Sequence, residues 1–162
     1  MKNLGASLKV SFLVLFAFAL VAGCKKSVEV QSTEHEGLLI RAWVDGMKQA
    51  KYKVDSLTTG VYYVIDTVGT GAYVTAGNTI TISYTGQFLD GTTFDFSNSY
   101  TYVHKGGNTR MIPGWEDGIE KLNKGAYGTF LIPSSQAYGS NGYLVVPGNT
   151  PLLFNIKVIN IQ

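Results

Sequence analysis

Apolar and polar positions alternate along much of the chain after residue 59. The segment TITISYTGQF (79–88) shows this most clearly, because Ile80, Ile82 and Tyr84 fall on one face while threonine and serine occupy the other. A period of two is typical of a β-strand with one buried face in an antiparallel sheet. The sequence therefore predicts an antiparallel strand here, with its isoleucines in the core.

Other segments extend the sheet. Asp90-Gly91 follows the first strand and is a strong hairpin signal, so we expect the chain to return through residues 93–96. Three further segments are rich in β-branched and aromatic residues and are predicted to be strands: VYYVIDTV (61–68), AYGTFLI (126–132) and PLLFNIKVINI (151–161). In the last one, alternation predicts that four side chains face the same way: Leu152, Phe154, Ile156 and Val158.

The segment before the strands has the helical period. Leu39, Trp43, Met47 and Ala50 recur at helical spacing, and Thr33 followed by Glu36 fits a capping box. We expect an amphipathic helix over about residues 34–50. Gly46 lowers its intrinsic stability by roughly 1 kcal/mol relative to Ala, so its apolar face needs a docking surface. That surface is either the core of this chain or a dimer or other protein partner.

A second helix is predicted in the stretch MIPGWEDGIEKL (111–122). Pro113 suits a first helical position, and acids in the first turn complement the helix dipole. Trp115 shares a face with Ile119 and Leu122, whereas Glu116 and Asp117 are expected to face solvent. Because adjacent helix residues point in different directions, this acidic pair is not expected to act as paired catalytic carboxylates. The predicted fold is α+β: an antiparallel β-sheet wrapped around one short helix and preceded by an N-terminal helix.

Residues 1–23 have the pattern of a signal peptide: a basic start, an apolar run too short to span a membrane, and small residues before Cys24. The motif resembles the lipobox of bacterial lipoproteins, in which the cysteine is lipidated and becomes the new N-terminus. An ordinary secretory signal is the alternative. Cys24 is the only cysteine, so no internal disulfide can form. We therefore expect a polar tether over residues 24–32, a helical extension over 33–58, a single domain over 59–162, and a lipid-anchored, periplasm-facing protein.

Charge and motifs exclude several classes of function. Without the leader, 11 basic residues face 11 acidic ones, and this balance argues against nucleic-acid binding. His35 and His104 have no cysteine or carboxylate at ligand spacing, so no metal is expected. No nucleophile motif or phosphate-binding loop occurs, and no cofactor is expected. What remains is an aromatic and aliphatic pocket suited to an apolar ligand or to a conformational change.

Four segments in order resemble an FKBP-type peptidyl-prolyl cis-trans isomerase: YTGQFLDGTTFD (84–95), MIPGWEDGI (111–119), LIPSSQAYG (131–139) and VVPGNTPLLFNIKVI (145–159). The resemblance runs from about residue 60 to residue 161. The preceding helix is similar to the N-terminal extension of lipoprotein members in Bacteroidetes-like bacteria. The resemblance implies an isomerase (EC 5.2.1.8) that acts on proline-containing polypeptides during the folding of exported proteins, and that binds macrolide ligands.

The resemblance also implies roles for individual residues. Phe94 and Asp95 match the pair beside the reacting amide, Trp115 matches the tryptophan under the proline ring, and Tyr138 matches the tyrosine whose hydroxyl bonds a ligand carbonyl. The matching substrate-binding positions are Tyr84, Tyr102, Met111, Ile112, Tyr143, Val145 or Val146, and Phe154.

Three features depart from the family pattern. The stretch between Phe94 and Tyr102 is shorter than in the best-known members and lacks the arginine that usually pairs with the aspartate. The loop after Tyr138 is also shorter, and HKGGNT (104–109) replaces an apolar segment. A catalytically weak or inactive FKBP-fold chaperone or binding module is therefore the alternative, and a surface scaffold with exposed tyrosines is a third possibility.

Overall fold

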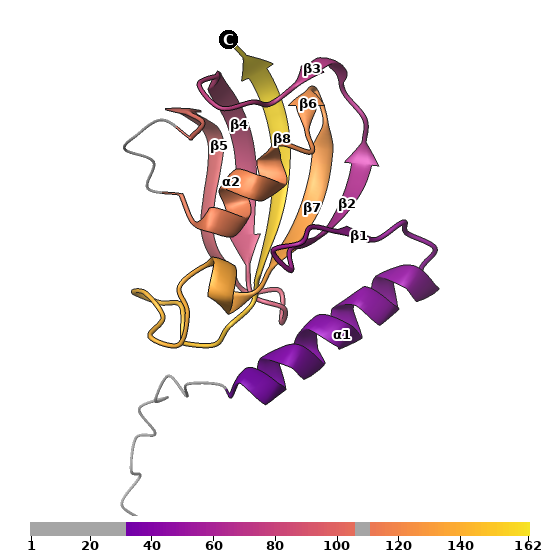
Figure 1. Cartoon of the computed structure of the whole chain (residues 1–162), viewed down its shortest axis with the longest axis vertical. Coiled ribbons are helices and arrows are strands. Elements are labelled where there is room, and N and C mark those ends of the chain that lie inside the picture. Colours follow the sequence, from indigo (N-terminus) through magenta and orange to yellow (C-terminus); the bar gives the residue numbers. More distant parts are fainter. Residues whose placement is uncertain (1–31, 106–110) are drawn as a thin grey trace, which may run out of the picture.

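A six-stranded antiparallel sheet forms the body of the protein, with strand order β1-β2-β7-β8-β4-β5 (Figure 1). The computed structural model describes residues 32–105 and 111–162. The predicted leader, Cys24 and nearly all of the tether lie outside the described residues. The strands of this sheet are β1 (Asp55–Ser56), β2 (Tyr62–Thr67), β4 (Thr79–Gln87), β5 (Thr93–Val103), β7 (Tyr127–Ile132) and β8 (Leu152–Ile161). The predicted strands are thereby confirmed, and the returning strand is longer than expected.

The remaining elements are helices and one small sheet. Helix α1 spans Thr33–Gln49, helix α2 spans Pro113–Ile119, and a short 3₁₀ helix, η1, spans Ser134–Gln136. The strands β3 (Thr70–Tyr73) and β6 (Asn123–Lys124) pair with each other in a second sheet that the sequence did not predict. The predicted α+β class, with one short helix on an antiparallel sheet and an N-terminal helix before it, is confirmed.

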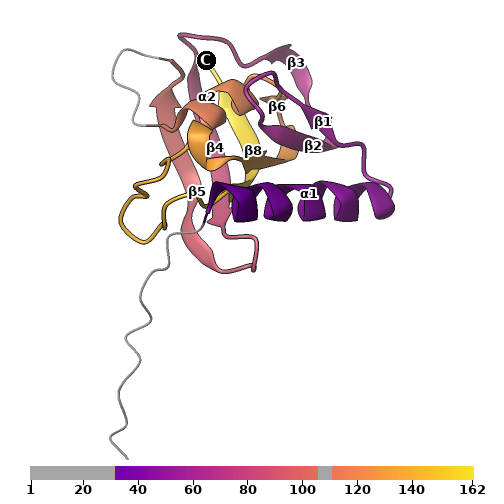
Figure 2. The ribbon, with the colours of Figure 1, turned by 60° about the horizontal axis from the view of Figure 1, so that its bottom comes forward.

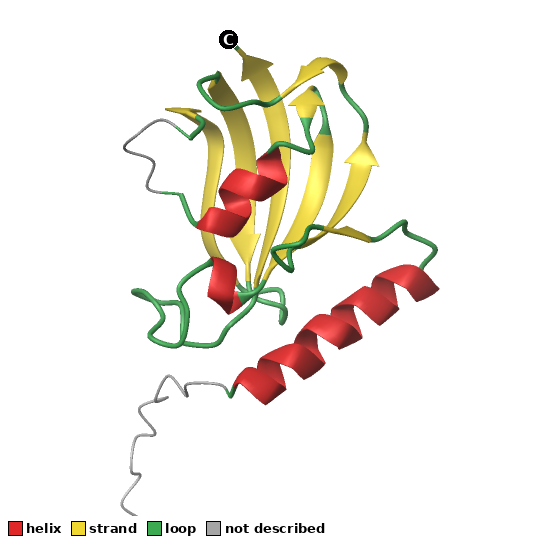
Figure 3. Ribbon diagram, viewed as in Figure 1, coloured by secondary structure: helices red, strands yellow, loops and turns green. Residues whose placement is uncertain are grey.

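Helix α2 lies across one face of the sheet and supplies the centre of the core (Figure 3). Trp115, Ile119 and Leu122 are all buried, as the helical spacing predicts. They meet the buried face of β8, where Leu152, Phe154, Ile156 and Val158 alternate with more exposed residues. Gly118 permits this close approach, because a Cβ at this position would lie 2.8 Å from Cδ1 of Phe130.

Strand β4 is less regular than its sequence suggests. Ile80 and Ile82 are fully buried, but the register with β5 shifts between Ile82 and Tyr84. The irregularity changes the local pairing, and Tyr84 is only half-buried. The strict alternation therefore holds for the isoleucines, whereas Tyr84 lies at the margin of the core.

Helix α1 lies beyond one end of the sheet (Figure 2). The predicted capping box is wrong: Ser32 is the N-cap and its Oγ accepts a hydrogen bond from the His35 N–H, while the Glu36 side chain bonds Ser134 far along the chain. Of the predicted apolar face, Leu39, Trp43 and Met47 are half-buried and Ala50 is exposed, whereas Val44 is buried. None of the helices in the described part of the chain is long and apolar enough to cross a membrane.

Candidate active site

Trp115 is the centre of an aromatic cluster built from three elements. Its indole packs edge-on against Tyr84 of β4, with ring centroids 5.1 Å apart, and against Phe154 of β8 at 5.0 Å. Tyr84 and Phe154 also contact each other at 6.4 Å. Only 1% of the Trp115 surface is exposed, so these two rings fix the indole in place. Three predicted site residues are therefore brought together by packing.

Phe94 extends the cluster along β5. Its ring lies 5.6 Å from Phe154 in an edge-to-face arrangement and 5.0 Å from Phe88, which was not predicted to take part. Gly86 lies beneath the rings, since a Cβ there would come within 2.8 Å of both Phe154 Cε1 and Phe94 Cζ. The missing side chain at Gly86 therefore leaves room for the phenyl rings of two predicted site residues.

Asp95 is exposed and receives its hydrogen bond from a tyrosine. The Tyr84 hydroxyl donates to Asp95 Oδ2 at 2.8 Å. Burial, followed by the hydrogen bond to Asp95, raises the pKa of Tyr84, so its hydroxyl stays a donor at neutral pH. Within the described ranges no lysine or arginine forms an ion pair with Asp95. Tyr84 is thus the side-chain donor that the structure gives to this carboxylate.

Tyr102 reaches the indole from the far end of β5. The Trp115 Nε1–H donates a 2.8 Å hydrogen bond to the Tyr102 hydroxyl, and the Tyr102 ring stacks on Tyr100 at 5.5 Å. Burial raises the pKa of Tyr102, and the bond from Trp115 opposes this rise only in part. A phenylalanine could not accept the indole proton, so this tyrosine satisfies a buried donor.

Tyr138 and Tyr143 form a second aromatic group on the loop between η1 and β8. Their rings stack with centroids 5.3 Å apart. Tyr138 is half-buried, and this burial raises the pKa of its hydroxyl. A tight turn follows, in which Tyr143 and Val146 exchange backbone hydrogen bonds. The turn separates the two candidate valines, because Val146 is in the core while 65% of Val145 is exposed.

Met111 and Ile112 precede α2. Ile112 is the N-cap residue and is buried, and its carbonyl accepts hydrogen bonds from the backbone N–H groups of Trp115 and Glu116. Met111 is half-buried and packs against the core. Both residues therefore lie at the start of the helix that carries the indole.

The sequence of this chain matches a known protein family. The sequence model of the family described as FKBP-type peptidyl-prolyl cis-trans isomerase matches residues 71–159, more than half of the chain. The chain belongs to the FKBP family. This match includes every predicted site residue except the lipidation cysteine.

Individual FKBP relatives give the same assignment. An FKBP-type peptidyl-prolyl cis-trans isomerase, FkpA, of Aeromonas hydrophila is 32% identical over 138 residues, covering 85% of this chain and 49% of that protein. FkpA of Escherichia coli K12 is 32% identical over 122 residues, covering 71% of this chain and 43% of the relative. The chain thus spans about half the length of the curated relatives it matches.

Solved FKBP structures share the fold. The crystal structure of FkpA from Escherichia coli superposes with a TM-score of 0.68 at 29% identity, covering 80% of this chain and 59% of the other. A peptidyl-prolyl cis-trans isomerase from Pseudomonas syringae pv. tomato gives 0.68 at 30% identity, covering 82% and 97% respectively. The match therefore covers nearly the whole of that isomerase.

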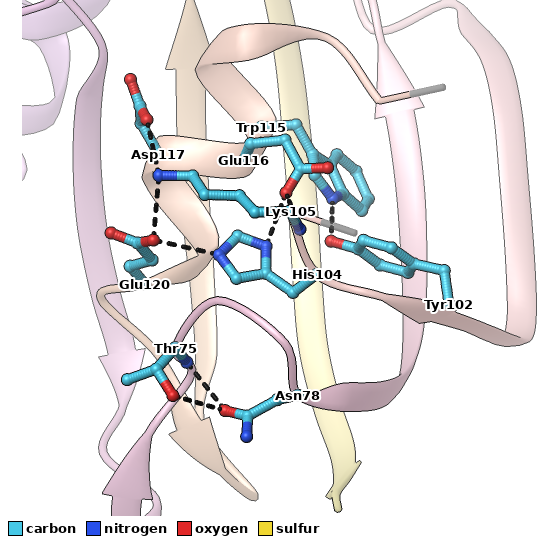
Figure 4. A network of polar contacts seen from close by, with 9 residues as sticks. All are labelled: Thr75, Asn78, Tyr102, His104, Lys105, Trp115, Glu116, Asp117 and Glu120. Atoms are coloured by element: carbon cyan, nitrogen blue, oxygen red, sulfur yellow. Dashed lines mark hydrogen bonds and ion pairs between the residues drawn. The ribbon is translucent and has the colours of Figure 1, made fainter. Parts of the chain in front are cut away.

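The sequence did not predict the polar cluster behind the indole of this FKBP domain (Figure 4). His104 is fully buried between two acids of adjacent turns: Nδ1 lies 2.5 Å from Glu116 Oε2, and Nε2 lies 3.0 Å from Glu120 Oε1. Lys105 pairs with Glu120 at 3.0 Å and with Asp117 at 3.4 Å. The expectation that Glu116 faces solvent is therefore wrong, because its carboxylate is buried against the imidazole.

The same cluster ties three segments together. The Lys105 backbone N–H donates to Glu116 Oε2 at 3.2 Å, and the His104 backbone bonds the turn that contains Asn78. Burial raises the pKa of Glu120, but the hydrogen bonds from His104 and Lys105 outweigh it and lower the pKa overall. No group of three metal-ligating side chains with suitable geometry occurs in residues 32–105 and 111–162. The contacts of His104 and Lys105 with Glu116 and Glu120 brace α2.

Proposed function

We propose that this protein is a peptidyl-prolyl cis-trans isomerase that assists the folding of exported polypeptides. The observation that carries the proposal is the aromatic cluster around Trp115, in which rings from β4, β5 and β8 converge on the first turn of α2. Family membership supports the same activity. The activity is a proposal for this chain, because the chain matches only about half the length of these curated relatives.

The chemistry needs no nucleophile. An X-Pro bond isomerises slowly because twisting the amide breaks its resonance, with a barrier of roughly 18–20 kcal/mol. The twisted amide is less conjugated and less polar than the planar one, so aromatic surroundings that exclude water favour it. Each tenfold gain in rate requires about 1.4 kcal/mol of stabilisation specific to the transition state.

Roles follow from position and chemistry. In the proposed site, Trp115 supports the proline ring, and Phe94 and Asp95 border the amide that rotates. The Tyr138 hydroxyl and the Ile112 N–H hold flanking carbonyls, so that rotation occurs about a single bond. The other residues proposed to bind substrate are Tyr84, Tyr102, Met111, Tyr143, Val145, Val146 and Phe154.

A refolding assay tests this function. A substrate protein whose refolding is limited by a prolyl bond should refold faster with catalytic amounts of the wild type. Tyr138→Phe, which removes only the hydroxyl, should lose most of that acceleration. Refolding at the uncatalysed rate would contradict an isomerase.

A second function, a chaperone or binding module of low activity, is favoured by two features. Asp95 is hydrogen-bonded to Tyr84, and no cation of residues 32–105 and 111–162 forms an ion pair with it. In addition, Leu144 and Val145 expose 85% and 65% of their surface at a turn beside Tyr143. This function predicts suppression of client aggregation without any acceleration of proline-limited refolding. Acceleration would exclude it.

We further propose that Cys24 carries a lipid and that the domain faces the periplasm, on the support of the leader pattern that precedes this residue. Two or more acyl chains suffice for lasting membrane attachment. Cys24→Ala should abolish incorporation of labelled palmitate and release the protein from the membrane fraction. Labelling that survives this substitution would contradict the anchor.

A further inference from the structure

Glu36 is a buried carboxylate on an otherwise exposed turn of α1. Its neighbours Glu34 and His35 are exposed, but only 7% of Glu36 is accessible to solvent. The Ser134 N–H donates to Glu36 Oε1 at 2.5 Å, and the Ser134 hydroxyl donates to Oε2 at 2.7 Å. Each oxygen of this acid therefore has a donor, and both donors belong to one residue 98 positions away in the sequence.

Ser134 begins η1, and its carbonyl holds the backbone on both sides of Tyr138. It accepts hydrogen bonds from the Ala137 N–H at 2.9 Å and from the Gly139 N–H at 2.8 Å. The Gly139 carbonyl in turn accepts from the Asn149 N–H at 2.9 Å, which closes the loop that carries Tyr143. Hydrogen bonds through Ser134 thus connect Glu36 to Ala137 and Gly139, the residues on either side of Tyr138.

Few side chains of α1 are fully buried. Glu36 and Val44 are the buried residues among those described in this helix. A carboxylate is costly to remove from water unless it is fully hydrogen-bonded, and here both bonds go to one serine. Such a group has a large effect on the geometry of the residue that it contacts. Glu36 also lies outside the 71–159 region that matches the family.

We propose that Glu36 is a positioning residue for Tyr138, so that the N-terminal helix completes the isomerase site. The carboxylate fixes Ser134, Ser134 fixes the backbone at residues 137 and 139, and the Tyr138 hydroxyl is thereby held towards the substrate carbonyl. This role rests on the proposed function. It gives α1 a part in catalysis as well as in connecting the domain to its tether.

Kinetics test the link to Tyr138. Glu36→Ala should lower kcat/KM roughly tenfold, the effect of losing a hydrogen-bonded charged group. If Tyr138→Phe acts mainly on kcat, Glu36→Ala should also act mainly on kcat, and the same holds for KM. In the Tyr138→Phe background, Glu36→Ala should have little further effect, because residues that act as a unit are not additive. Glu34→Ala, an acid of the same turn, is the matched control and should match the wild type. Full additivity, or wild-type kinetics in Glu36→Ala, would overturn the proposal.

Amide hydrogen exchange tests the positioning without any assay of activity. Glu36→Ala, or Glu36→Gln if the former folds poorly, should speed exchange at Ala137 and Gly139 while leaving the core amide of Ile156 protected. Unchanged exchange at Ala137 and Gly139 would overturn the proposal even in an active enzyme. If the wild type shows no isomerase activity, the proposed function fails, and the exchange result still decides whether Glu36 holds the Tyr138 loop.

Discussion

The hydroxyl of Tyr84 on β4 donates a 2.8 Å hydrogen bond to the carboxylate of Asp95 on β5. The same tyrosine packs edge-on against Trp115. Tyr84 therefore connects the exposed acid of the proposed site to its buried indole. Within residues 32–105 and 111–162 no lysine or arginine forms an ion pair with this acid, and its side-chain donor is the neutral hydroxyl of Tyr84.

Tyr84→Phe removes this bond and keeps the ring. Because Asp95 then loses its donor, we expect kcat/KM to fall about tenfold, the loss of a hydrogen bond to a charged group. Asp95→Asn should produce a similar loss, and the double variant should lose little more than either single one. Steady-state kinetics of the four proteins measure this coupling. Losses that multiply would show that the two residues act separately.

Gly86→Ala should disturb the aromatic cluster directly. The added methyl group would lie 2.8 Å from carbons of both Phe94 and Phe154, two rings with little freedom to move. Overpacking of this kind costs about 1–3 kcal/mol, so we expect a lower free energy of unfolding and weaker catalysis. Gly37→Ala, where a Cβ meets nothing within 4 Å, is the control and should preserve both. Wild-type activity in Gly86→Ala would show that the position of these rings is unimportant.

His104→Ala tests the buried brace of α2. Removing the imidazole takes away the side chain that contacts the buried Glu116 carboxylate, and leaving a buried polar group without its partner costs about 1–3 kcal/mol. Urea denaturation should show this loss. The partly exposed Lys105→Ala should cost at most about 1 kcal/mol. Equal and small effects for both variants would contradict a bracing role for His104.

Three half-buried tyrosines of the proposed site predict how stability depends on alkaline pH. Burial raises the pKa of Tyr84, Tyr102 and Tyr138 above the usual value of about 10. A group whose pKa is raised on folding stabilises the fold below its unfolded pKa, and this contribution is lost as pH rises towards the folded pKa. The contribution of these tyrosines to the free energy of unfolding should therefore be constant between about pH 7 and 9. It should fall above about pH 10. Tyr138→Phe should reduce that fall. A slope unchanged by this substitution would exclude Tyr138 as a contributor.

The sequence predicted the parts of the fold that depend on local pattern. Ile80 and Ile82 follow a period of two, and Trp115 and Ile119 follow the helical period, so their burial could be read from spacing. The family resemblance then selected the residues that the structure brings together around Trp115. Local pattern also chose the wrong cap for α1, because Ser32 and Thr33 are equally suitable in type and only the backbone distinguishes them.

The parts that could not be predicted depend on pairings between distant elements. Glu116 has the sequence context of a solvated first-turn acid, and only the packing of α2 against the end of β5 brings it to His104. Glu36 has the sequence context of a capping residue. Its partner, Ser134, lies 98 positions further along the chain. Both acids are buried by contacts with residues far away in the sequence, and such contacts leave no periodic signal.

A protease-free assay of prolyl isomerisation on a proline tetrapeptide tests the central claim most directly. The wild type should accelerate isomerisation above background, and both Trp115→Phe and Tyr138→Phe should reduce kcat/KM while the folded state persists by circular dichroism. Because the indole N–H bonds Tyr102, Tyr102→Phe should have a smaller effect that acts through Trp115. A wild-type rate equal to background, or rates unchanged in both Trp115→Phe and Tyr138→Phe, would contradict catalysis by this aromatic cluster.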